Sequence, residues 1–235
     1  MTVNPQEIQR FDLLAEEWWD TEGPMAPLHR MNPTRMNYVS NTLLKHFKIL
    51  KNINILDVGC GGGLVSEPVA RMGANVTGID GAQELIRIAD LHAEAQDLKI
   101  DYRHCLTSDL IKENAQFDAI LALEVIEHVP DPDAFIADIS ALLKPGGLVI
   151  FSTLNRSAAA LAFGVIGAEY ILRWLPAGTH QWSSFIKPSE LFTMCHPHQL
   201  QPKETMGLTF HPVSGEFHLN ENNLSINYFL TAIKE

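Results

Sequence analysis

The chain has 235 residues, of which 46% are hydrophobic and 19% charged, and its 28 acidic and 17 basic residues give a formal net charge of −11. This apolar fraction excludes a disordered chain, and the acidic balance argues against a nucleic-acid partner. Three widely spaced cysteines, an acidic N-terminus and the lack of a bilayer-length apolar run predict a cytoplasmic protein without disulfides, signal peptide or membrane span. We therefore expect one globular domain over residues 1–235.

The first fifty residues are expected to form a helical cap. Apolar residues recur there at spacings of three and four, as on one face of a helix: Ile8, Phe11, Leu14 and Trp18. After a proline-rich loop, Asn32 followed by Pro33 is typical of a helix start, with a side-chain cap before a proline in the first turn. We therefore expect a second helix to begin at Pro33.

From residue 53 onward, short apolar runs alternate with helical stretches. The expected strands are Ile53–Val58, Asn75–Asp80, Ile100–Arg103, Asp118–Leu123 and Leu148–Thr153. The expected helices between them include Ala82–Ala95 and Asp133–Leu143. This alternation is typical of βαβ units with a parallel sheet and right-handed crossovers. An antiparallel edge is expected from three further runs: Leu208–Pro212, Glu216–Leu219 and Ile226–Ile233.

The most informative motif joins the first strand to the helix that follows it. Asp57 is followed by three alternate glycines, Gly59, Gly61 and Gly63. Glycine is needed where the backbone turns tightly and a ligand must approach without a Cβ in the way. The second strand ends at Asp80, whose carboxylate can accept hydrogen bonds from both hydroxyls of a ribose. The motif therefore predicts a nucleoside-containing cofactor.

The spacing of these glycines separates two classes of cofactor. The dinucleotide fingerprint needs a glycine at the position of Leu64 or of Ser66, depending on where it starts. The observed pattern, an aspartate two residues before three alternate glycines, resembles motif I of class I S-adenosylmethionine-dependent methyltransferases.

The fourth expected strand runs into a group of candidate site residues: Leu123, Glu124, Glu127 and His128. Ligands of doubly wound sheets bind outside the carboxyl ends of the strands, so these residues emerge beside the glycine loop. Leu123 is placed to pack on an adenine ring. The two carboxylates and the imidazole can hold a divalent ion, act as acid–base groups on a phenol, or only shape the cofactor pocket. The residues by themselves leave these three roles open.

Taken together, the segments along the chain resemble the ubiquinone-biosynthesis O-methyltransferase family. The similarity rests on the following segments: Arg10–Phe11, Trp18–Asp20, Pro27–Arg35, Leu56–Gly63, Glu124–Pro132, Phe151–Arg156, Gly167–Arg173, Gly178–His180 and Phe185–Pro188. It implies an α/β, Rossmann-like class I methyltransferase with a mostly parallel seven-stranded sheet, helices on both faces and an antiparallel C-terminal edge. It also implies S-adenosylmethionine-dependent methylation of phenolic hydroxyls on polyprenylated precursors, at both O-methylation steps of ubiquinone synthesis.

The resemblance also assigns site residues. The implied cofactor-binding residues are Arg35, Gly59, Gly61, Asp80 and Leu123. The guanidinium of Arg35 suits the methionine carboxylate through a bidentate pair. A divalent cation, magnesium, is implied at Glu124, Glu127 and His128, and His128 is the candidate general base if it is not a ligand. Many members of the wider superfamily bind adenine through an acid just after the third strand, and this chain has none there.

One segment has a composition of its own. Residues 157–168 carry no charge and are too few to span a bilayer, but they suit an apolar lid or an interfacial helix. Trp174 and Trp182 are placed to lie at a headgroup boundary. We expect residues 157–174 to enclose the substrate's polyprenyl tail or to make a peripheral membrane contact. An ordinary helix covering the sheet is the alternative.

We expect this single methyltransferase domain to have four parts: a helical cap at 1–50, a cofactor-binding core at 51–153, an apolar insertion at 154–187, and the C-terminal part of the sheet at 188–235. The expected partners are a polyprenylated phenol or quinol and a ubiquinone-biosynthesis complex, with no nucleic acid. Two other functions stay open: a methyltransferase of the same fold that acts on another small molecule, and a non-catalytic quinol or lipid carrier.

Overall fold

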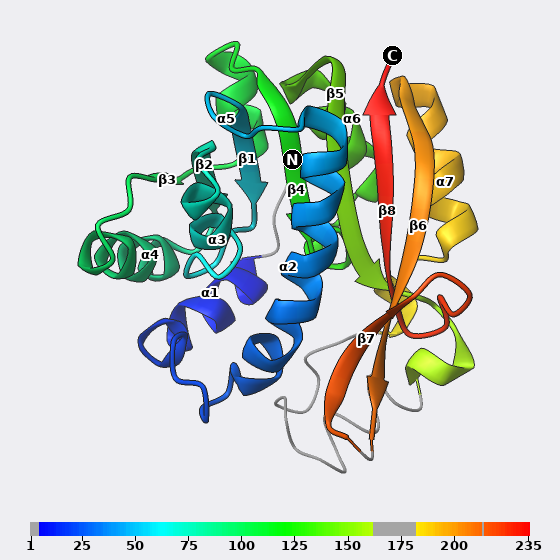
Figure 1. The fold of residues 1–235 in the computed structure, drawn as a ribbon, viewed down its shortest axis with the longest axis horizontal. Helices are drawn as coiled ribbons and strands as arrows, with labels where there is room; N and C mark the ends of the chain where they lie inside the picture. The colour runs from blue at the N-terminus through cyan, green and yellow to red at the C-terminus, as the bar shows by residue number, and fades with distance from the viewer. Residues whose placement is uncertain (1–4, 162–181, 213) are drawn as a thin grey trace.

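The structure, a computed structural model, describes residues 5–161, 182–212 and 214–235, which fold around one mixed sheet (Figure 1). The strands are β1 (Asn54–Val58), β2 (Asn75–Asp80), β3 (Asp101–His104), β4 (Phe117–Leu123), β5 (Leu143–Leu154), β6 (Leu200–His211), β7 (Glu216–Asn220) and β8 (Asn227–Lys234). The α-helices are α1 (Pro5–Leu13), α2 (Ala26–Phe47), α3 (Ser66–Arg71), α4 (Gln83–Ala95), α5 (Thr107–Lys112), α6 (Pro132–Leu142) and α7 (Pro188–Cys195). Short 3-10 turns include η1 (Ala15–Glu17), η2 (Ile126–His128), η4 (Trp182–Ser184) and η5 (His196–His198).

The sheet has the strand order β3-β2-β1-β4-β5-β8-β6-β7. Strands β1 to β5 pair in parallel, whereas β8, β6 and β7 pair antiparallel at one side. The predicted α/β fold with an antiparallel edge is therefore confirmed. The family resemblance implied seven strands, whereas the sheet has eight, as many as the apolar runs expected from the sequence pattern, with β7 pairing with β6 as a hairpin.

The strand β6 is much longer than the sequence predicted. We expected it to begin at Leu208, but it begins at Leu200 and contains Pro202. The pairing of β6 with β8 shifts register between Pro202 and Glu204. A proline cannot donate to a β-ladder, so it is tolerated in a strand at such an irregularity. The proline and the charged residues next to it interrupt the apolar pattern, so the sequence did not indicate the first half of β6.

The second helix also begins earlier than predicted. The helix α2 starts at Ala26, and Pro33 lies inside it and not at its first turn. Asn32 is therefore not an N-cap. Its side chain instead donates a hydrogen bond to the carbonyl of Leu64 and accepts two from Arg35. Tertiary contacts to the glycine loop thus outweigh the local start signal.

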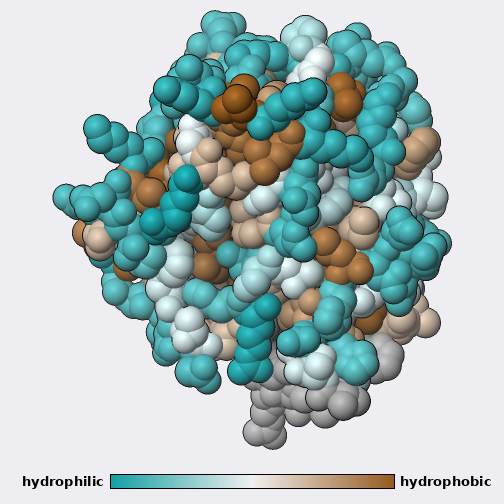
Figure 2. Space-filling view, viewed as in Figure 1, coloured by the Kyte–Doolittle hydropathy of each residue, from teal (hydrophilic) through white to brown (hydrophobic). Residues whose placement is uncertain are grey.

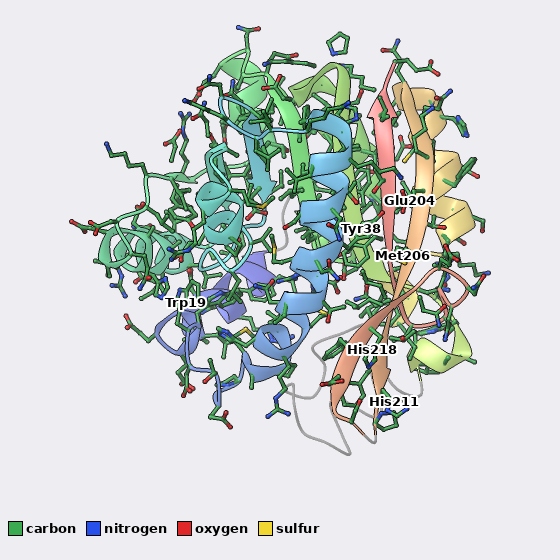
Figure 3. The ribbon with its side chains drawn as sticks, viewed as in Figure 1. Trp19, Tyr38, Glu204, Met206, His211 and His218 are labelled. Carbon is green, nitrogen blue, oxygen red and sulfur yellow. The ribbon has the colours of Figure 1, made fainter. Side chains whose placement is uncertain are left out.

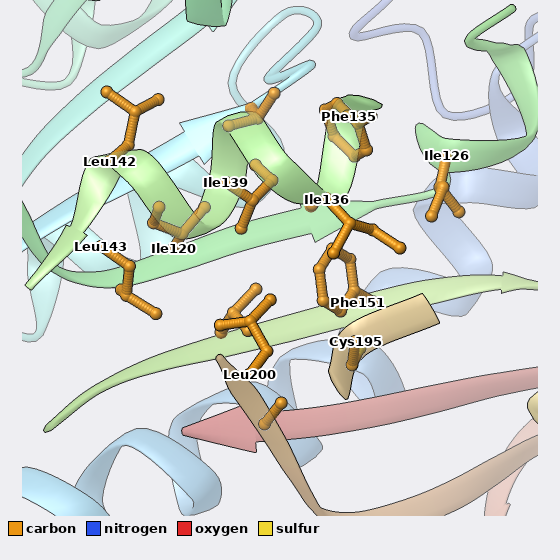
Figure 4. Close-up of a cluster of buried hydrophobic side chains, with 14 of the residues drawn as sticks. Ile120, Ile126, Phe135, Ile136, Ile139, Leu142, Leu143, Phe151, Cys195 and Leu200 are labelled. Carbon is orange, nitrogen blue, oxygen red and sulfur yellow. The ribbon is translucent and has the colours of Figure 1, made fainter. Parts of the chain in front are cut away.

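Helices cover both faces of the sheet and bury a separate hydrophobic cluster on each. On one face, α2 and α3 contribute Val39, Leu43 and Val69 to a cluster with residues of β1 and β4. On the other face, α6 and α7 pack Phe135 and Leu191 against the sheet. Figure 4 shows the α6 side chains facing those of β4 and β5. The sheet is therefore apolar on both faces, as parallel sheets usually are.

The connection pattern fixes where a ligand can bind. Successive strands run outward from β1 to β3, and the chain then returns to place β4 on the other side of β1. This reversal is the switch point at which doubly wound sheets bind ligands, outside the carboxyl ends of the strands. In Figure 1 the helix α1 lies near the edge toward which the β1 arrow points. The N-terminal segment therefore belongs to the site.

Within the described residues, no helix combines the length and the apolar character needed to cross a membrane. Hydrophilic side chains cover most of the face shown in Figure 2, with small hydrophobic groups between them. The cysteines are all free, as predicted. Most of the predicted apolar insertion, including Trp174, lies outside the described residues, and the proposed division of the chain into four parts stays a prediction.

Candidate functional site

The glycine loop follows β1 and packs against the turn that follows β4. The amides of Gly59 and Cys60 both donate to the carbonyl of Ile79 in β2, at 2.8 and 3.0 Å. Gly59 has a φ of +67°, and a Cβ on it would lie 2.5 Å from Cγ2 of Val125. Glycine is therefore required at Gly59 both by its left-handed backbone and by the close approach of the turn after β4.

The N-terminal segment covers the middle of this loop. A Cβ on Gly61 or Gly62 would lie 2.4 or 2.3 Å from the indole of Trp18. The neighbouring Trp19, labelled in Figure 3, donates from Nε1 to the carbonyl of Gly62 at 3.0 Å and stacks on the ring of His92. The tryptophan pair therefore packs on the glycine loop.

Asp80 ends β2 beside the loop, as predicted. Its two carboxylate oxygens accept hydrogen bonds from the amides of Gly61 and Ala82, at 3.0 and 2.8 Å. Burial raises the pKa of Asp80, although these two amides oppose the shift. Each oxygen can accept a further hydrogen bond, so the half-buried carboxylate can still receive a ribose hydroxyl.

Arg35 carries a buried charge at the inner end of the site. The side chain is on α2, only 4% exposed, and its Nε and one terminal nitrogen both donate to Oδ1 of Asn32. No described carboxylate forms an ion pair with it within 4.0 Å. Burial lowers the pKa of Arg35, while the charges of Glu124 and Asp57 raise it. A buried guanidinium with no paired anion is suited to bind the carboxylate of a ligand.

Asp57 lies behind the loop and is buried. Its Oδ2 accepts a hydrogen bond from Oγ of Ser66 at 2.5 Å. Burial raises the pKa of Asp57 to about 6, and the Ser66 hydroxyl and the Arg35 charge oppose this shift. Asp57 therefore fixes the start of α3 and compensates part of the Arg35 charge.

The turn after β4 places Glu124 in a strained backbone position. Glu124 has a φ of +58°, which residues with a side chain adopt at a cost of about 1–3 kcal/mol. Its carboxylate accepts from Ser152 Oγ at 2.6 Å and from Asn227 Nδ2 at 3.0 and 3.1 Å. These contacts to β5 and β8 hold the strained residue. Leu123, just before it, is packed in the core and only 7% exposed, so its predicted contact with adenine stays a prediction.

Glu127 is buried beside Glu124. Its Oε2 accepts from the hydroxyl of Thr153 at 2.9 Å, but its Oε1 is buried without a hydrogen-bond partner among the described residues. Burial and the nearby Glu124 charge raise the pKa of Glu127 to about 7. The carboxyl group is therefore able to take up or release a proton near neutral pH, and it has one oxygen available for a ligand.

His128 is turned toward the N-terminal helix. Its Nδ1 lies 3.1 Å from Oε2 of Glu7, and its ring meets the edge of Phe11 at a centroid distance of 5.7 Å. Burial disfavours the imidazolium, but the carboxylates of Glu7 and Glu127 outweigh that effect and raise the pKa of His128. The contact with Glu7 was not predicted, because it joins the first helix to the turn after β4.

The three predicted metal ligands are neighbours that face different partners. Glu124 is bound by Ser152 and Asn227, and His128 is paired with Glu7. Among the described residues, no group of three His, Cys, Asp or Glu side chains is placed to hold a metal ion. The Oε1 of Glu127 is buried without a hydrogen-bond partner among the described residues, and metal binding at these residues stays a prediction.

Comparisons with known proteins concern the family and the fold. Residues 29–203 match a family model described as a methyltransferase domain. Proteins called ubiquinone biosynthesis O-methyltransferase are similar over 99% of the chain: one from Cereibacter sphaeroides is 43% identical over 97% of its own length, and one from Pelagibacter ubique is 44% identical over 99%. A solved structure of magnesium protoporphyrin IX methyltransferase from Synechocystis has a TM-score of 0.69 at 17% identity, covering 97% of this chain and 95% of its own. This last similarity concerns the fold.

The contact between Trp18 and the glycine loop predicts a specific coupling. Gly62→Ala should lower the free energy of unfolding by about 1–3 kcal/mol, because its Cβ overlaps the indole. In a Trp18→Ala background the same change should cost almost nothing, since the overlapping ring is gone. Gly61→Ala should stay costly in both backgrounds, because its φ of +53° strains alanine regardless of Trp18. Urea unfolding of the variants as a double-mutant cycle measures this. An equal cost of Gly62→Ala in both backgrounds would contradict the contact.

Proposed function

The chain belongs to the ubiquinone biosynthesis O-methyltransferase family, and from this premise we propose that it uses S-adenosylmethionine to methylate phenolic hydroxyls on polyprenylated ubiquinone precursors. We propose the same activity for both O-methylation steps. The support is the name shared by relatives that match almost the full chain, together with a site whose residues suit this cofactor.

The observation that carries the proposal is the buried guanidinium of Arg35, which forms no ion pair with a carboxylate in the part of the chain that the structure describes. The carboxylate of the cofactor's methionine part would pair with this guanidinium, next to the exposed backbone of Gly59. The ribose hydroxyls would donate to Asp80, which already accepts a hydrogen bond from the amide of Gly61. When bound, S-adenosylmethionine supplies a methyl group activated by the sulfonium charge.

The turn after β4 would serve the phenol that accepts the methyl group. We assign His128 as the general base that takes the phenolic proton, with the Glu7 carboxylate beside Nδ1 stabilising the imidazolium that results. Glu127 would hold the acceptor by a hydrogen bond at Oε1, which is buried without a partner among the described residues. The chain's own contribution is therefore to orient the phenol and remove its proton.

If a divalent cation such as Mg²⁺ binds, Glu124, Glu127 and His128 are its proposed ligands and His128 is then not the base, although no three such side chains among the described residues are already placed around an ion. Carboxylate oxygens are the ligands that this ion prefers, and the two glutamates lie close enough for the charge of one to raise the pKa of the other. A bound cation would lower the pKa of the phenol and help to orient its oxygen.

Replacing Arg35 separates cofactor binding from folding. Arg35→Gln should weaken S-adenosylmethionine binding by about tenfold to a hundredfold, because it removes the charged hydrogen bonds to the carboxylate. The free energy of unfolding of the ligand-free protein should not fall, since the variant no longer buries an unpaired charge. Titration calorimetry and urea unfolding measure the two effects. Lys45→Gln, at an exposed position of the same helix, is the control. Full cofactor affinity in Arg35→Gln would overturn the assignment.

The activity itself is tested with labelled cofactor and a demethylated ubiquinol that carries a short isoprenoid tail. Methyl transfer to oxygen is expected, and His128→Asn should lower kcat by about a hundredfold or more while cofactor affinity stays within about twofold. A parallel assay with a chelator tests the cation, which should be needed for full turnover. A protein that binds S-adenosylmethionine but methylates no phenol would refute the proposed substrate class, and one that binds no cofactor would point to a carrier.

We also propose that the enzyme collects its substrate at a membrane surface through residues 157–174, and works within a ubiquinone-biosynthesis complex. The support is the uncharged composition of residues 157–168 and the poor water solubility expected of a polyprenylated substrate.

Vesicle flotation tests this membrane contact. The full-length protein should float with liposomes, and Trp174→Ser should reduce the floated fraction, because tryptophan anchors segments at the headgroup level. Phe192→Ser, at an exposed position of α7, is the control. No flotation of the wild-type protein would contradict the proposed contact.

A further inference from the structure

A hollow lies beside the turn after β4, and no residue of the glycine loop lines it. It is a cavity of about 720 Å³ whose walls come from the turn after β4, the start of α6, residues 183–186 and one face of α7. A volume of this size is typical of sites that enclose a small organic ligand. The cavity is separate from the contacts of Gly59, Asp80 and Arg35 described above.

The strand order places this cavity beside the cofactor residues. The exit of β4 lies between the ends of β1 and β5. On the β1 side of the turn after β4, Val125 approaches Gly59; on the β5 side, Glu127 and Val129 line the cavity with Arg156, which follows β5. A molecule in the cavity would therefore lie close, at this turn, to the cofactor proposed to bind at the glycine loop.

The lining of the cavity indicates what kind of molecule it takes. The lining combines six apolar residues, Val129, Pro130, Pro132, Phe185, Ile186 and Met194, with seven polar or charged ones, among them the ion pair of Arg156 and Glu190. At one end stands the buried Glu127, whose Oε1 has no hydrogen-bond partner in the described part of the chain. A buried carboxyl oxygen without a partner is costly unless a ligand satisfies it. This combination fits an apolar molecule that carries a hydroxyl group.

The walls are held by bonds to the sheet. The amide of Ile186 donates to the carbonyl of Leu154 in β5 at 3.1 Å, and its carbonyl accepts from the Tyr228 hydroxyl of β8 at 3.0 Å. Arg156 forms an ion pair with Glu190, which itself lies on α7 and binds the amide of Lys187. The cavity is thus a preformed feature of the fold, which limits the entropy lost on binding.

We propose that this cavity is the acceptor site, in which Glu127 receives the phenolic hydroxyl and the α7 face formed by Ser189, Thr193 and Met194 selects the apolar substituent on the ring. The inference rests on the proposed function for the reaction, but the cavity can be tested by binding alone. It makes α7 a determinant of acceptor specificity, a role that neither its sequence nor its distance from the glycine motif indicated.

The test places a large side chain in the cavity by substituting residues of α7 that line it. Thr193→Trp and Ser189→Trp, made separately in the full-length protein, place a large side chain on a lining position, and Phe192→Trp alters an exposed residue of the same helix that does not line the cavity. The probes are a dihydroxybenzene without a tail and the same ring carrying two isoprene units. KM and kcat are measured with each probe, and equilibrium dialysis measures binding without turnover.

The filled variants should raise KM for the tailed probe by about tenfold or more, with a smaller effect on the tail-less ring, because less room is left for the substituent. S-adenosylmethionine affinity should stay unchanged, which also shows that each variant is folded. Phe192→Trp should behave as the wild type. Unchanged KM and unchanged dialysis binding in both filled variants would overturn the acceptor site. A wild-type protein that binds the tailed probe in the cavity but does not methylate it would instead overturn the proposed function alone.

Discussion

The site is organised around one buried positive charge. Arg35 lies on α2, and its guanidinium is buried away from water, which lowers its pKa. Removing such a charge from water costs several kcal/mol unless other charges compensate it. Asp57 and Glu124 compensate it from a distance, and Asn32 accepts two of its hydrogen bonds. A carboxylate of a bound ligand can therefore pair with this guanidinium. The position of Arg35 depends on the packing of α2 against the sheet.

Backbone strain is gathered at the same two strand ends. After β1, left-handed glycines bring the chain back toward α3, and after β4 the left-handed Glu124 turns the chain toward η2. The two turns meet where Val125 approaches Gly59. Glycine tolerates its position without cost, whereas Glu124 depends on hydrogen bonds from Ser152 and Asn227, so β5 and β8 support a residue that belongs to the site.

The sequence predicted those parts of the molecule that local chemistry determines. The strand β2 was predicted to the residue, and the glycine loop and Asp80 lie as expected, because periodicity and glycine spacing act over short distances. The start of α2 was wrong, since Pro33 gives the same local signal inside a helix as at its start. The contacts of Trp18 with the glycine loop and of Glu7 with His128 join remote segments, and no pattern in either segment encodes them.

The charges of this edge favour a cationic ligand. Burial raises the pKa of Asp57, Asp80 and Glu127, which means that each carboxylate is held at an energetic cost that a nearby positive charge would reduce. The sulfonium of S-adenosylmethionine carries such a charge, and methyl transfer removes it. These carboxylates would thus attract S-adenosylmethionine more strongly than its demethylated product. The methionine carboxylate would pair with Arg35 in both molecules. An acidic edge around one buried arginine therefore suits both retention of the methyl donor and release of the spent one.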